Sequence, residues 1–172
     1  MKVDVGFIGC GTLGGSIATG LAKAPEFKGR LILSDPFNKA NMEKLYSLYP
    51  EKVVPADSHE DLLNQAEIIF PAVLPKLLPD IMSNLTFTEK HKVIHVAAGI
   101  DLAEGRKYYG NAGKVLRAVP LPFASRRMGP MVLFGDDVYC QKLFSLFGTL
   151  INVLTEEEFE VLALHNELMV SY

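Results

Sequence analysis

The sequence has 172 residues, of which 49% are apolar and 22% are charged, a balance typical of a globular domain and not of a disordered or fibrous chain. Lys and Arg number 17 and Asp and Glu number 20, so the net charge is −3, and the lack of a basic block argues against nucleic-acid or anionic-membrane partners. No apolar stretch approaches the roughly 20 residues that a membrane span needs. Two cysteines, Cys10 and Cys140, are too few for a disulfide framework or a zinc site. We therefore expect a cytoplasmic protein with reduced thiols and no bound metal.

Predicted strands and helices alternate along nearly the whole chain, with no repeat or flexible linker to divide it. In chain order they are strand 3–8, helix 12–23, strand 31–34, helix 38–48, strand 52–56, a helix capped by Ser58, strand 67–73, helix 76–85, strand 92–98, helix 102–109, strand 114–119, a Pro/Arg/Gly loop beyond Pro120, strand 131–134, helix 137–146, strand 151–154 and a helix from 156 to the end. Parallel strands joined by crossover helices predict an α/β fold with a doubly wound, mainly parallel sheet and a C-terminal helix.

A glycine-rich loop with the pattern G-x-G-x-x-G lies between the first predicted strand and the first predicted helix, and it consists of Gly9, Cys10, Gly11, Thr12, Leu13 and Gly14. The first glycine allows a tight turn, the second allows a pyrophosphate to approach the backbone, and the third allows the helix to pack on the strand. The helix N-terminus offers free N–H groups and a partial positive charge to the anion. The sequence therefore predicts a Rossmann-type dinucleotide-binding domain, with a merely structural glycine turn as the alternative.

An acidic residue, Asp35, ends the second predicted strand 21 residues beyond Gly14. A carboxylate at this separation accepts hydrogen bonds from the adenosine ribose and repels a 2′-phosphate, so NAD is favoured over NADP. Ser34 and Asn38 lie beside it and could accommodate a phosphate, which keeps NADP open. Asp is also a common turn residue before a proline such as Pro36.

Further motifs follow the glycine loop in a specific order. They are Ile68-Ile69-Phe70-Pro71-Ala72-Val73-Leu74-Pro75, Ala97-Ala98-Gly99-Ile100, Arg117-Ala118-Val119-Pro120 and Leu143-Phe144-Ser145-Leu146-Phe147-Gly148 with Glu156 to Glu158. With these motifs the chain resembles the pyrroline-5-carboxylate reductase family over most of residues 3 to 165. The resemblance implies that residues 1–155 bind a nicotinamide dinucleotide for reduction of a cyclic imine that carries a carboxylate. It also implies that 156–172 begin a helical dimerisation segment.

Loops at the carboxyl ends of the strands converge on the ligand in open α/β sheets. The expected cofactor wall is Ala72, Val73, Leu74, Pro75, Ala97, Ala98 and Gly99, although Gly and Pro are also common in plain strand-to-helix turns. The candidate substrate contacts are Pro120, Leu121, Arg126 and Asn166. Arg126 could bind a carboxylate through its guanidinium or belong to a solvated pair with Arg127. His165 is the candidate proton donor, with a surface position as the alternative.

The remaining titratable residues have structural interpretations. His95 lies in an apolar strand, where a hydrogen-bonded core histidine is favoured over a proton donor. His59 and His91 have polar neighbours and are expected to be exposed. Arg117, inside a predicted strand, is expected to form a structural ion pair. Cys10 and Cys140 are expected to be small packing residues.

Three functions fit these patterns. The first is an NAD(P)-dependent oxidoreductase that acts on a small imine or carbonyl carboxylate. The second is a non-catalytic dinucleotide-binding module or regulatory homologue, because Leu74 and Leu121 stand where the resembled family has lysine and asparagine. The third, prompted by Gly14, Gly15, Ser16 and Asp35, is a fragment related to prephenate or hydroxyacid dehydrogenases. The C-terminal helix is apolar on more than one face, so we expect a C2 homodimer through it, with packing on its own sheet as the alternative.

Overall fold

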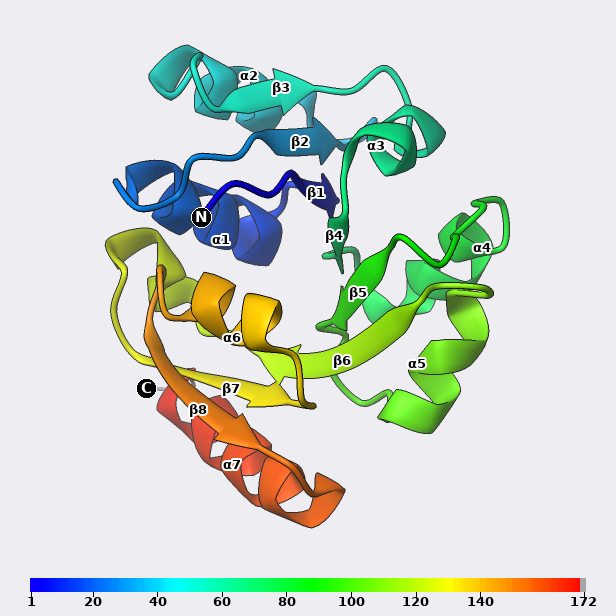
Figure 1. Cartoon of the computed structure of the whole chain (residues 1–172), viewed down its shortest axis with the longest axis vertical. Helices are drawn as coiled ribbons and strands as arrows, with labels where there is room; N and C mark the ends of the chain where they lie inside the picture. Colours follow the sequence, from blue (N-terminus) through cyan, green and yellow to red (C-terminus); the bar gives the residue numbers. More distant parts are fainter. Residues whose placement is uncertain (171–172) are drawn as a thin grey trace.

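The computed structural model describes residues 1–170, with the side chains of Pro122 and of residues 166–170 outside the described part. Eight strands of this part form one sheet (Figure 1), and they are β1 (Val5–Ile8), β2 (Leu31–Ser34), β3 (Val53–Pro55), β4 (Ile68–Pro71), β5 (Lys92–His95), β6 (Lys114–Val119), β7 (Pro130–Phe134) and β8 (Thr149–Val153). The helices are α1 (Thr12–Lys23), α2 (Lys39–Leu48), α3 (His59–Gln65), the 3-10 turn η1 (Pro75–Leu77), α4 (Leu78–Met82), α5 (Leu102–Tyr108), the 3-10 turn η2 (Pro122–Arg126), α6 (Val138–Phe144) and α7 (Glu156–Val170).

The strand order is β3-β2-β1-β4-β5-β6-β7-β8, and every neighbouring pair is parallel except β6 with β7. The predicted doubly wound, mainly parallel sheet is confirmed. The chain order reverses between β1 and β4. Gly6 of β1 lies at this point, between Ile32 of β2 and Ile69 of β4. In such sheets the ligand crevice lies outside the carboxyl ends of the strands at this switch point.

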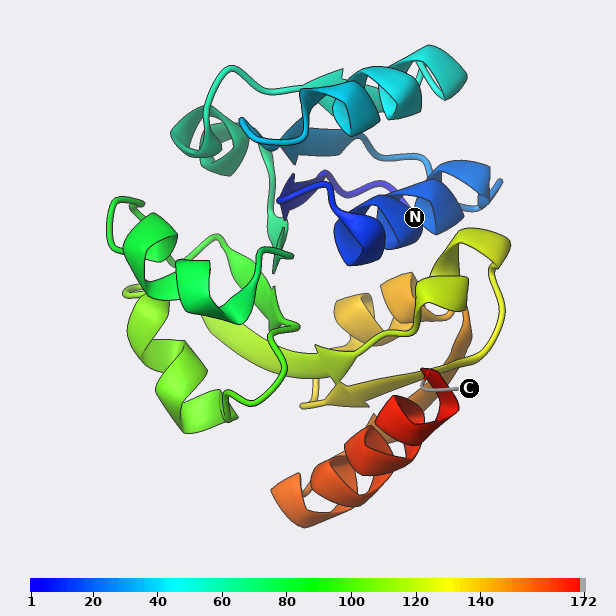
Figure 2. The same ribbon diagram turned by 180° about the vertical axis from the view of Figure 1, so that it is seen from behind.

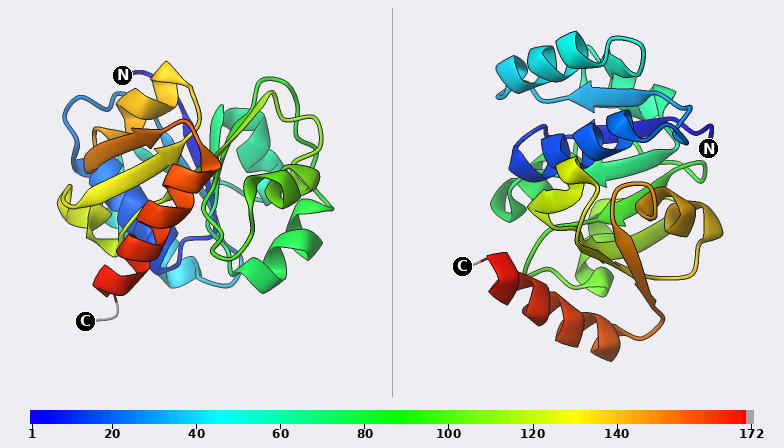
Figure 3. Two further views of the ribbon diagram at one scale, coloured as in Figure 1. Left: turned by 90° about the horizontal axis from the view of Figure 1, so that it is seen from below. Right: turned by 90° about the vertical axis from the view of Figure 1, so that its left-hand side faces the viewer.

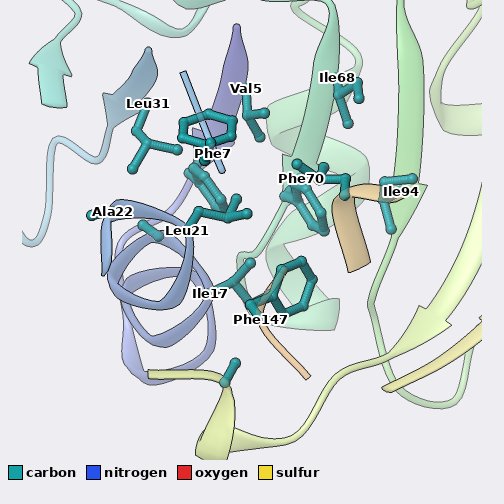
Figure 4. Close-up of a cluster of buried hydrophobic side chains, with 14 of the residues drawn as sticks. Val5, Phe7, Ile17, Leu21, Ala22, Leu31, Ile68, Phe70, Ile94 and Phe147 are labelled. Atoms are coloured by element: carbon teal, nitrogen blue, oxygen red, sulfur yellow. The ribbon is translucent and has the colours of Figure 1, made fainter. Parts of the chain in front are cut away.

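Alternate residues of each strand face opposite sides of the sheet and pack under different helices. One core joins α1, α2 and α6 to the sheet, and Figure 4 shows its centre, where Phe7 and Phe70 stack with ring centroids 5.1 Å apart. The second core packs residues of α3 and α4 against the other face. On that face α7 covers the β7–β8 end through Phe159 and Ala163, opposite α6 (Figure 3, left). Turned by 180°, the molecule shows α7 at the far end of the sheet from α2 (Figure 2).

Two predicted segments differ in the structure. The helix expected at 76–85 is divided into η1 and α4, because Pro79 lacks the N–H that would continue the first turn into the second. The expected loop beyond Pro120 contains η2, which packs against α1 at Gly20. A Cβ at Gly20 would lie 2.2 Å from the Ala124 carbonyl oxygen, so only glycine permits this contact. The turn ends at Arg127, which has a left-handed backbone (φ 56°).

Candidate functional site

The three glycines of the loop after β1 have different steric surroundings. Gly9 has φ +97°, and a Cβ there would lie 2.7 Å from the Ala72 carbonyl oxygen. A Cβ at Gly14 would lie 2.3 Å from the Gly9 carbonyl oxygen, so this glycine lets α1 pack onto the strand. A Cβ at Gly11 would meet nothing within 4 Å. Gly9 and Gly14 are thus required by the fold, whereas Gly11 keeps a space open above the loop.

The N-terminus of α1 faces this space without a side-chain cap. Gly11 is the N-cap residue, and the first turn of the helix holds no acidic residue. The amides of a first helical turn have no intrahelical acceptor, and the helix dipole places partial positive charge there. The arrangement suits a phosphate or pyrophosphate group, which supplies acceptors and negative charge without a metal or a basic side chain.

The Asp35 carboxylate at the end of β2 is oriented by backbone N–H groups. Its Oδ2 accepts from the N–H of Cys10 at 2.7 Å, and its Oδ1 accepts from the N–H of Phe37 and of Asn38, both at 3.0 Å. These three bonds fix the carboxylate beside the glycine loop. Since a carboxylate has about four acceptor sites, Oδ2 keeps capacity for a ligand hydroxyl.

Three adjoining hollows follow the carboxyl ends of the strands. The central cleft, of about 600 Å³, is lined by Gly9, Gly11, Thr12, Leu13, Asp35, Pro36, Phe37, Asn38, His59, Ala72, Val73, Leu74, Pro75, Leu77, Ile81, Val96, Ala97 and Ala98. The inner pocket, of about 730 Å³, is lined by Thr12, Leu13, Val96, Ala97, Ala98, Gly99, Arg117, Ala118, Val119, Pro120, Leu121, Glu160, Ala163 and Leu164. The outer pocket, of about 470 Å³, lies at the ends of β2 and β3 and shares Asp35, Pro36 and His59 with the central cleft. Together they form one trough past the switch point.

Most residues of the predicted cofactor site lie along this trough. The central cleft brings together Gly9, Gly11, Thr12, Leu13, Asp35, Ala72, Val73, Leu74, Pro75, Ala97 and Ala98. Ser34 lines the outer pocket, and Gly99, Pro120 and Leu121 line the inner pocket. Cys10 is buried under the loop, where burial raises the pKa of its thiol to about 12, and it contributes its backbone N–H to Asp35.

Of the predicted substrate and proton-transfer residues, two lie outside the trough and one has its side chain outside the described residues. Arg126 is exposed on η2 and does not line the hollows described above. His165 is exposed on α7 and likewise lines none of them. The side chain of Asn166 lies outside the described residues. Their roles as substrate or proton-transfer residues stay predictions.

The expected exposure of two histidines is wrong. His91 is 1% exposed, since its Nδ1 accepts from the Thr88 N–H and its Nε2 donates to the Leu63 carbonyl oxygen. His59 is half-buried, with Nδ1 2.7 Å from the Ser34 hydroxyl oxygen. Burial lowers the pKa of His59, and the negative charge of Asp35 opposes that shift. The sequence could not show these partners, which come from separate segments of the chain.

His95 is the hydrogen-bonded core residue that its strand predicts. It is fully buried, its Nδ1 lies 2.6 Å from the Tyr109 hydroxyl, and its Nε2 lies 3.3 Å from the Ile100 carbonyl oxygen. A carbonyl only accepts, so Nε2 carries the proton and the Tyr109 hydroxyl donates to Nδ1. The bond to Ile100 anchors the loop whose residues Ala97 and Ala98 line the central cleft.

The residues that α7 contributes to the inner pocket, Glu160, Ala163 and Leu164, were not predicted from the sequence. Only the packing of α7 on β7 and β8 places them at the pocket. The spacing of Glu156 and Glu160 predicts that they share a helix face. Nothing in the sequence identifies Arg117 as the residue that this face meets.

The described residues suit an organic phosphate group. The space kept open by Gly11 borders free helix-terminal amides, and the trough continues from it in both directions. Among the described side chains, no group of three or more His, Cys, Asp or Glu is arranged to hold a metal ion. No helix within residues 1–170 is both long and apolar enough to cross a bilayer.

A doubly wound sheet with a glycine loop at its switch point and an acid after its second strand defines the class of Rossmann-type dinucleotide-binding domains. Residues 4–99 match the model of the family described as "NADP oxidoreductase coenzyme F420-dependent". The match covers more than half of the chain, and the chain belongs to this oxidoreductase family.

Curated relatives and solved structures agree with this assignment. The pyrroline-5-carboxylate reductase of Escherichia coli is 30% identical over 124 residues, which are 70% of this chain and 45% of that enzyme. The enzyme of that name from Glycine max is 28% identical over 161 residues, which are 90% of this chain and 57% of the relative. The chain thus spans about half the length of these relatives. The structure of Plasmodium falciparum pyrroline carboxylate reductase with NADP bound superposes with a TM-score of 0.81 at 18% identity, over 99% of this chain and 64% of that one, and shares the fold.

Proposed function

We propose that the chain binds a nicotinamide dinucleotide along the trough and serves hydride transfer to or from a small imine or carbonyl compound in the inner pocket. The observation that carries this proposal is Gly11, which the fold does not require to be glycine and which keeps open the space before the N-terminus of α1. Family membership and the resemblance to pyrroline-5-carboxylate reductases support the same chemistry.

Each part of the trough has a separate task in this proposal. The α1 amides hold the pyrophosphate, and Asp35 accepts from a ribose hydroxyl through its remaining acceptor capacity. Ala97 and Ala98 line both the central cleft and the inner pocket, so they form the wall between dinucleotide and substrate. The nicotinamide supplies the hydride when it is bound, and the protein orients it and limits the access of water.

We further propose that NAD is preferred over NADP. The outer pocket, where a 2′-phosphate would lie, is lined by the acids Asp35, Glu43 and Asp57 and by one lysine, Lys39. With a neutral His59 the acids outnumber the cation, and this excess disfavours an additional phosphate. Ser34 and Lys39 are the residues that would have to receive a phosphate if NADP bound.

Calorimetric titration and thermal unfolding with NADH and NADPH test both proposals. At about 100 times its Kd, NADH stabilises the folded state by roughly 2.7 kcal/mol, which raises Tm by roughly 5–10 °C for a chain of this size. NADPH is expected to bind at least about tenfold more weakly because of the repulsion. Tighter binding of NADPH would reverse the preference, and lack of binding by both would refute the proposed function.

Gly11→Ala separates ligand binding from folding. The new methyl group would contact no protein atom, so Tm should fall by only about 2–4 °C, the cost of a poorer N-cap. It would occupy the space assigned to the pyrophosphate, so affinity for NADH should fall by at least about tenfold. Gly14→Ala is the matched contrast, because its methyl group would clash with the Gly9 carbonyl and prevent native packing. Unchanged NADH affinity in Gly11→Ala would argue against this binding mode.

Binding of NADH without turnover of any imine or carbonyl compound would favour a non-catalytic module.

A further inference from the structure

Arg117 on β6 is a buried guanidinium whose partners all come from one face of α7. Its side chain is 9% exposed, and its Nη1 donates to Oε1 of Glu160 and lies 3.8 Å from Oε1 of Glu156. The guanidinium also lies over the ring of Phe159, 4.6 Å from its centroid. These three partners neutralise the charge and cover the group, so Arg117 holds α7 beside the sheet.

The inner pocket therefore offers no free positive charge to a ligand. Among its described lining residues Arg117 is the only cation and Glu160 the only acid, and the rest are mainly small or apolar. The Glu160 side chain is half exposed and lines the pocket, so its charge is open to a ligand as well as to Arg117. With Glu156 included, two carboxylates surround one guanidinium, and the local charge is negative.

The negative local charge disfavours anionic ligands and favours cationic ones. A carboxylate that entered the pocket would have to displace an acid from Arg117, and it would be repelled by the acid that it displaced. A cation has no such cost, because Glu160 can face it while still accepting from Arg117 through the other oxygen. A small apolar ring would lie against Val96, Val119 and Leu164.

We propose that the inner pocket takes a small, apolar imine without a carboxylate, as its protonated iminium, and that Glu160 sets this preference. The proposal rests on the proposed function and specifies its substrate class. The iminium carbon gains the hydride, the C=N π pair becomes the nitrogen lone pair, and the nicotinamide dinucleotide is oxidised. The product is the neutral amine, and the proton on its nitrogen is the one that the iminium brought.

The test measures binding to the intact chain, by calorimetry, with two five-membered rings of opposite charge. Pyrrolidinium represents the cation, and tetrahydrofuran-2-carboxylate represents the anion. Each is titrated with and without saturating NADH. We expect pyrrolidinium to bind at least about tenfold more tightly, the change produced by roughly 1.4 kcal/mol. Equal or tighter binding of the carboxylate would overturn the proposal, as would failure of both rings to bind.

Glu160→Gln tests the assigned residue, and Glu157→Gln is the control. Glu157 loses the same charge on the same helix but lines a separate hollow near Val153 and Val161. Glu160→Gln should weaken pyrrolidinium binding about fivefold and tighten carboxylate binding by a similar factor, because Arg117 keeps only the more distant Glu156. Glu157→Gln should change neither by more than about twofold. An unchanged ratio in folded Glu160→Gln would refute the assignment.

The outcome for NADH is read separately, which distinguishes this proposal from the proposed function. NADH binding together with carboxylate preference would leave the proposed function intact and reject the iminium. Failure of NADH to bind would reject the proposed function, while the two rings titrated without NADH still decide the charge preference of the pocket.

Discussion

Three of the four histidines have hydrogen bonds that require a neutral ring or are buried enough to favour one. Nδ1 of His91 accepts from a backbone N–H, and Nδ1 of His95 accepts from the Tyr109 hydroxyl, so neither nitrogen can take a second proton without losing its partner. Burial is the largest cause of the lowered pKa at His59, His91 and His95. Each of these rings thus makes the folded state sensitive to acid.

The sign of this effect follows from proton linkage. A histidine whose folded pKa lies below its ordinary value of 6.5 binds fewer protons in the folded than in the unfolded state. The full stability is therefore present above pH 6.5 and decreases as the pH falls below that value toward the folded pKa. We expect Tm to be flat from pH 7 to 8 and to fall between pH 6.5 and 5.

His91→Gln isolates one of these rings. Its side-chain amide can still donate to the Leu63 carbonyl, but it cannot titrate. Unfolding by urea at pH 7.5, 6.5 and 5.5 should show a smaller loss of stability in the variant, by up to about 1.4 kcal/mol per pH unit. The same pH dependence in wild type and variant would show that His91 is protonated equally in both states.

The sequence predicts residues of the site best where backbone geometry alone dictates the residue type. Gly9, Gly14 and Asp35 have the expected places in the fold because a tight turn, a close helix contact and a carboxylate after the second strand leave few alternatives. Glu160 and the partners of His91 depend on segments that meet only after folding. Local sequence carries no signal for those contacts.

At the scale of secondary structure, Asp137 joins the start of α6 to two strands. Its Oδ1 accepts from the N–H of Cys140 as an N-cap, and its Oδ2 lies 2.9 Å from Lys92 Nζ and 3.4 Å from Lys114 Nζ. Burial raises the pKa of this carboxyl, but the bonds from Cys140 and Lys92 outweigh burial and lower the pKa to about 2. The stabilisation is thus present above pH 3.8 and is lost as the pH falls through about 2.

Two substitutions separate the cap from the charge of Asp137. Asp137→Asn keeps a side chain that can cap and should cost about 1 kcal/mol, whereas Asp137→Ala loses both and should cost about 2 kcal/mol. Chemical denaturation at pH 7 measures both values. Equal costs would mean that the cap contributes nothing beyond the charge.

Helix boundaries were predictable where a glycine loop or a capping side chain marks them, but not at an internal proline. Ser58 accepts from the Asp61 N–H as its spacing predicts, and α1 has the predicted bounds. Pro79 broke the helix expected at 76–85, since the apolar spacing there continues across a residue that cannot donate. The spacing of apolar residues carries no information about that missing hydrogen bond.

For the whole molecule, alternation of strands and helices was sufficient to predict the fold class but not the last part of the sheet. From β1 to β6 each crossover helix keeps the strands parallel. Between β6 and β7 the chain has only η2 and a turn, and β7 returns antiparallel. The left-handed backbone at Arg127 helps to reverse the chain. The sequence did not predict this conformation, because arginine rarely adopts it.

The outer side of α7 leads to a proposal about assembly. Phe159 and Ala163 face the sheet, whereas Val161 is 63% exposed and Leu154, just before the helix, is 67% exposed. Val161 lines a hollow with Val153 and Leu162, and exposed apolar surface of this kind favours burial against a partner. We propose a homodimer formed through this side of α7, in which the same face of each copy meets its equivalent.

Val161→Glu should convert such a dimer to monomers, because it would place two like charges near the symmetry axis of an apolar contact. Light scattering after gel filtration would give twice the 18.9 kDa chain mass for the wild type and the chain mass itself for the variant. Val138→Glu is the matched control, since Val138 is 57% exposed at the start of α6, on the opposite face of the sheet. A monomeric wild type at about 100 μM, roughly a hundred times the concentration that a micromolar dimer needs, would contradict the proposal. Dissociation by both variants would place the contact elsewhere. Dissociation by Val161→Glu alone would link the interface to the helix whose other side borders the inner pocket, so that assembly and substrate binding would share α7.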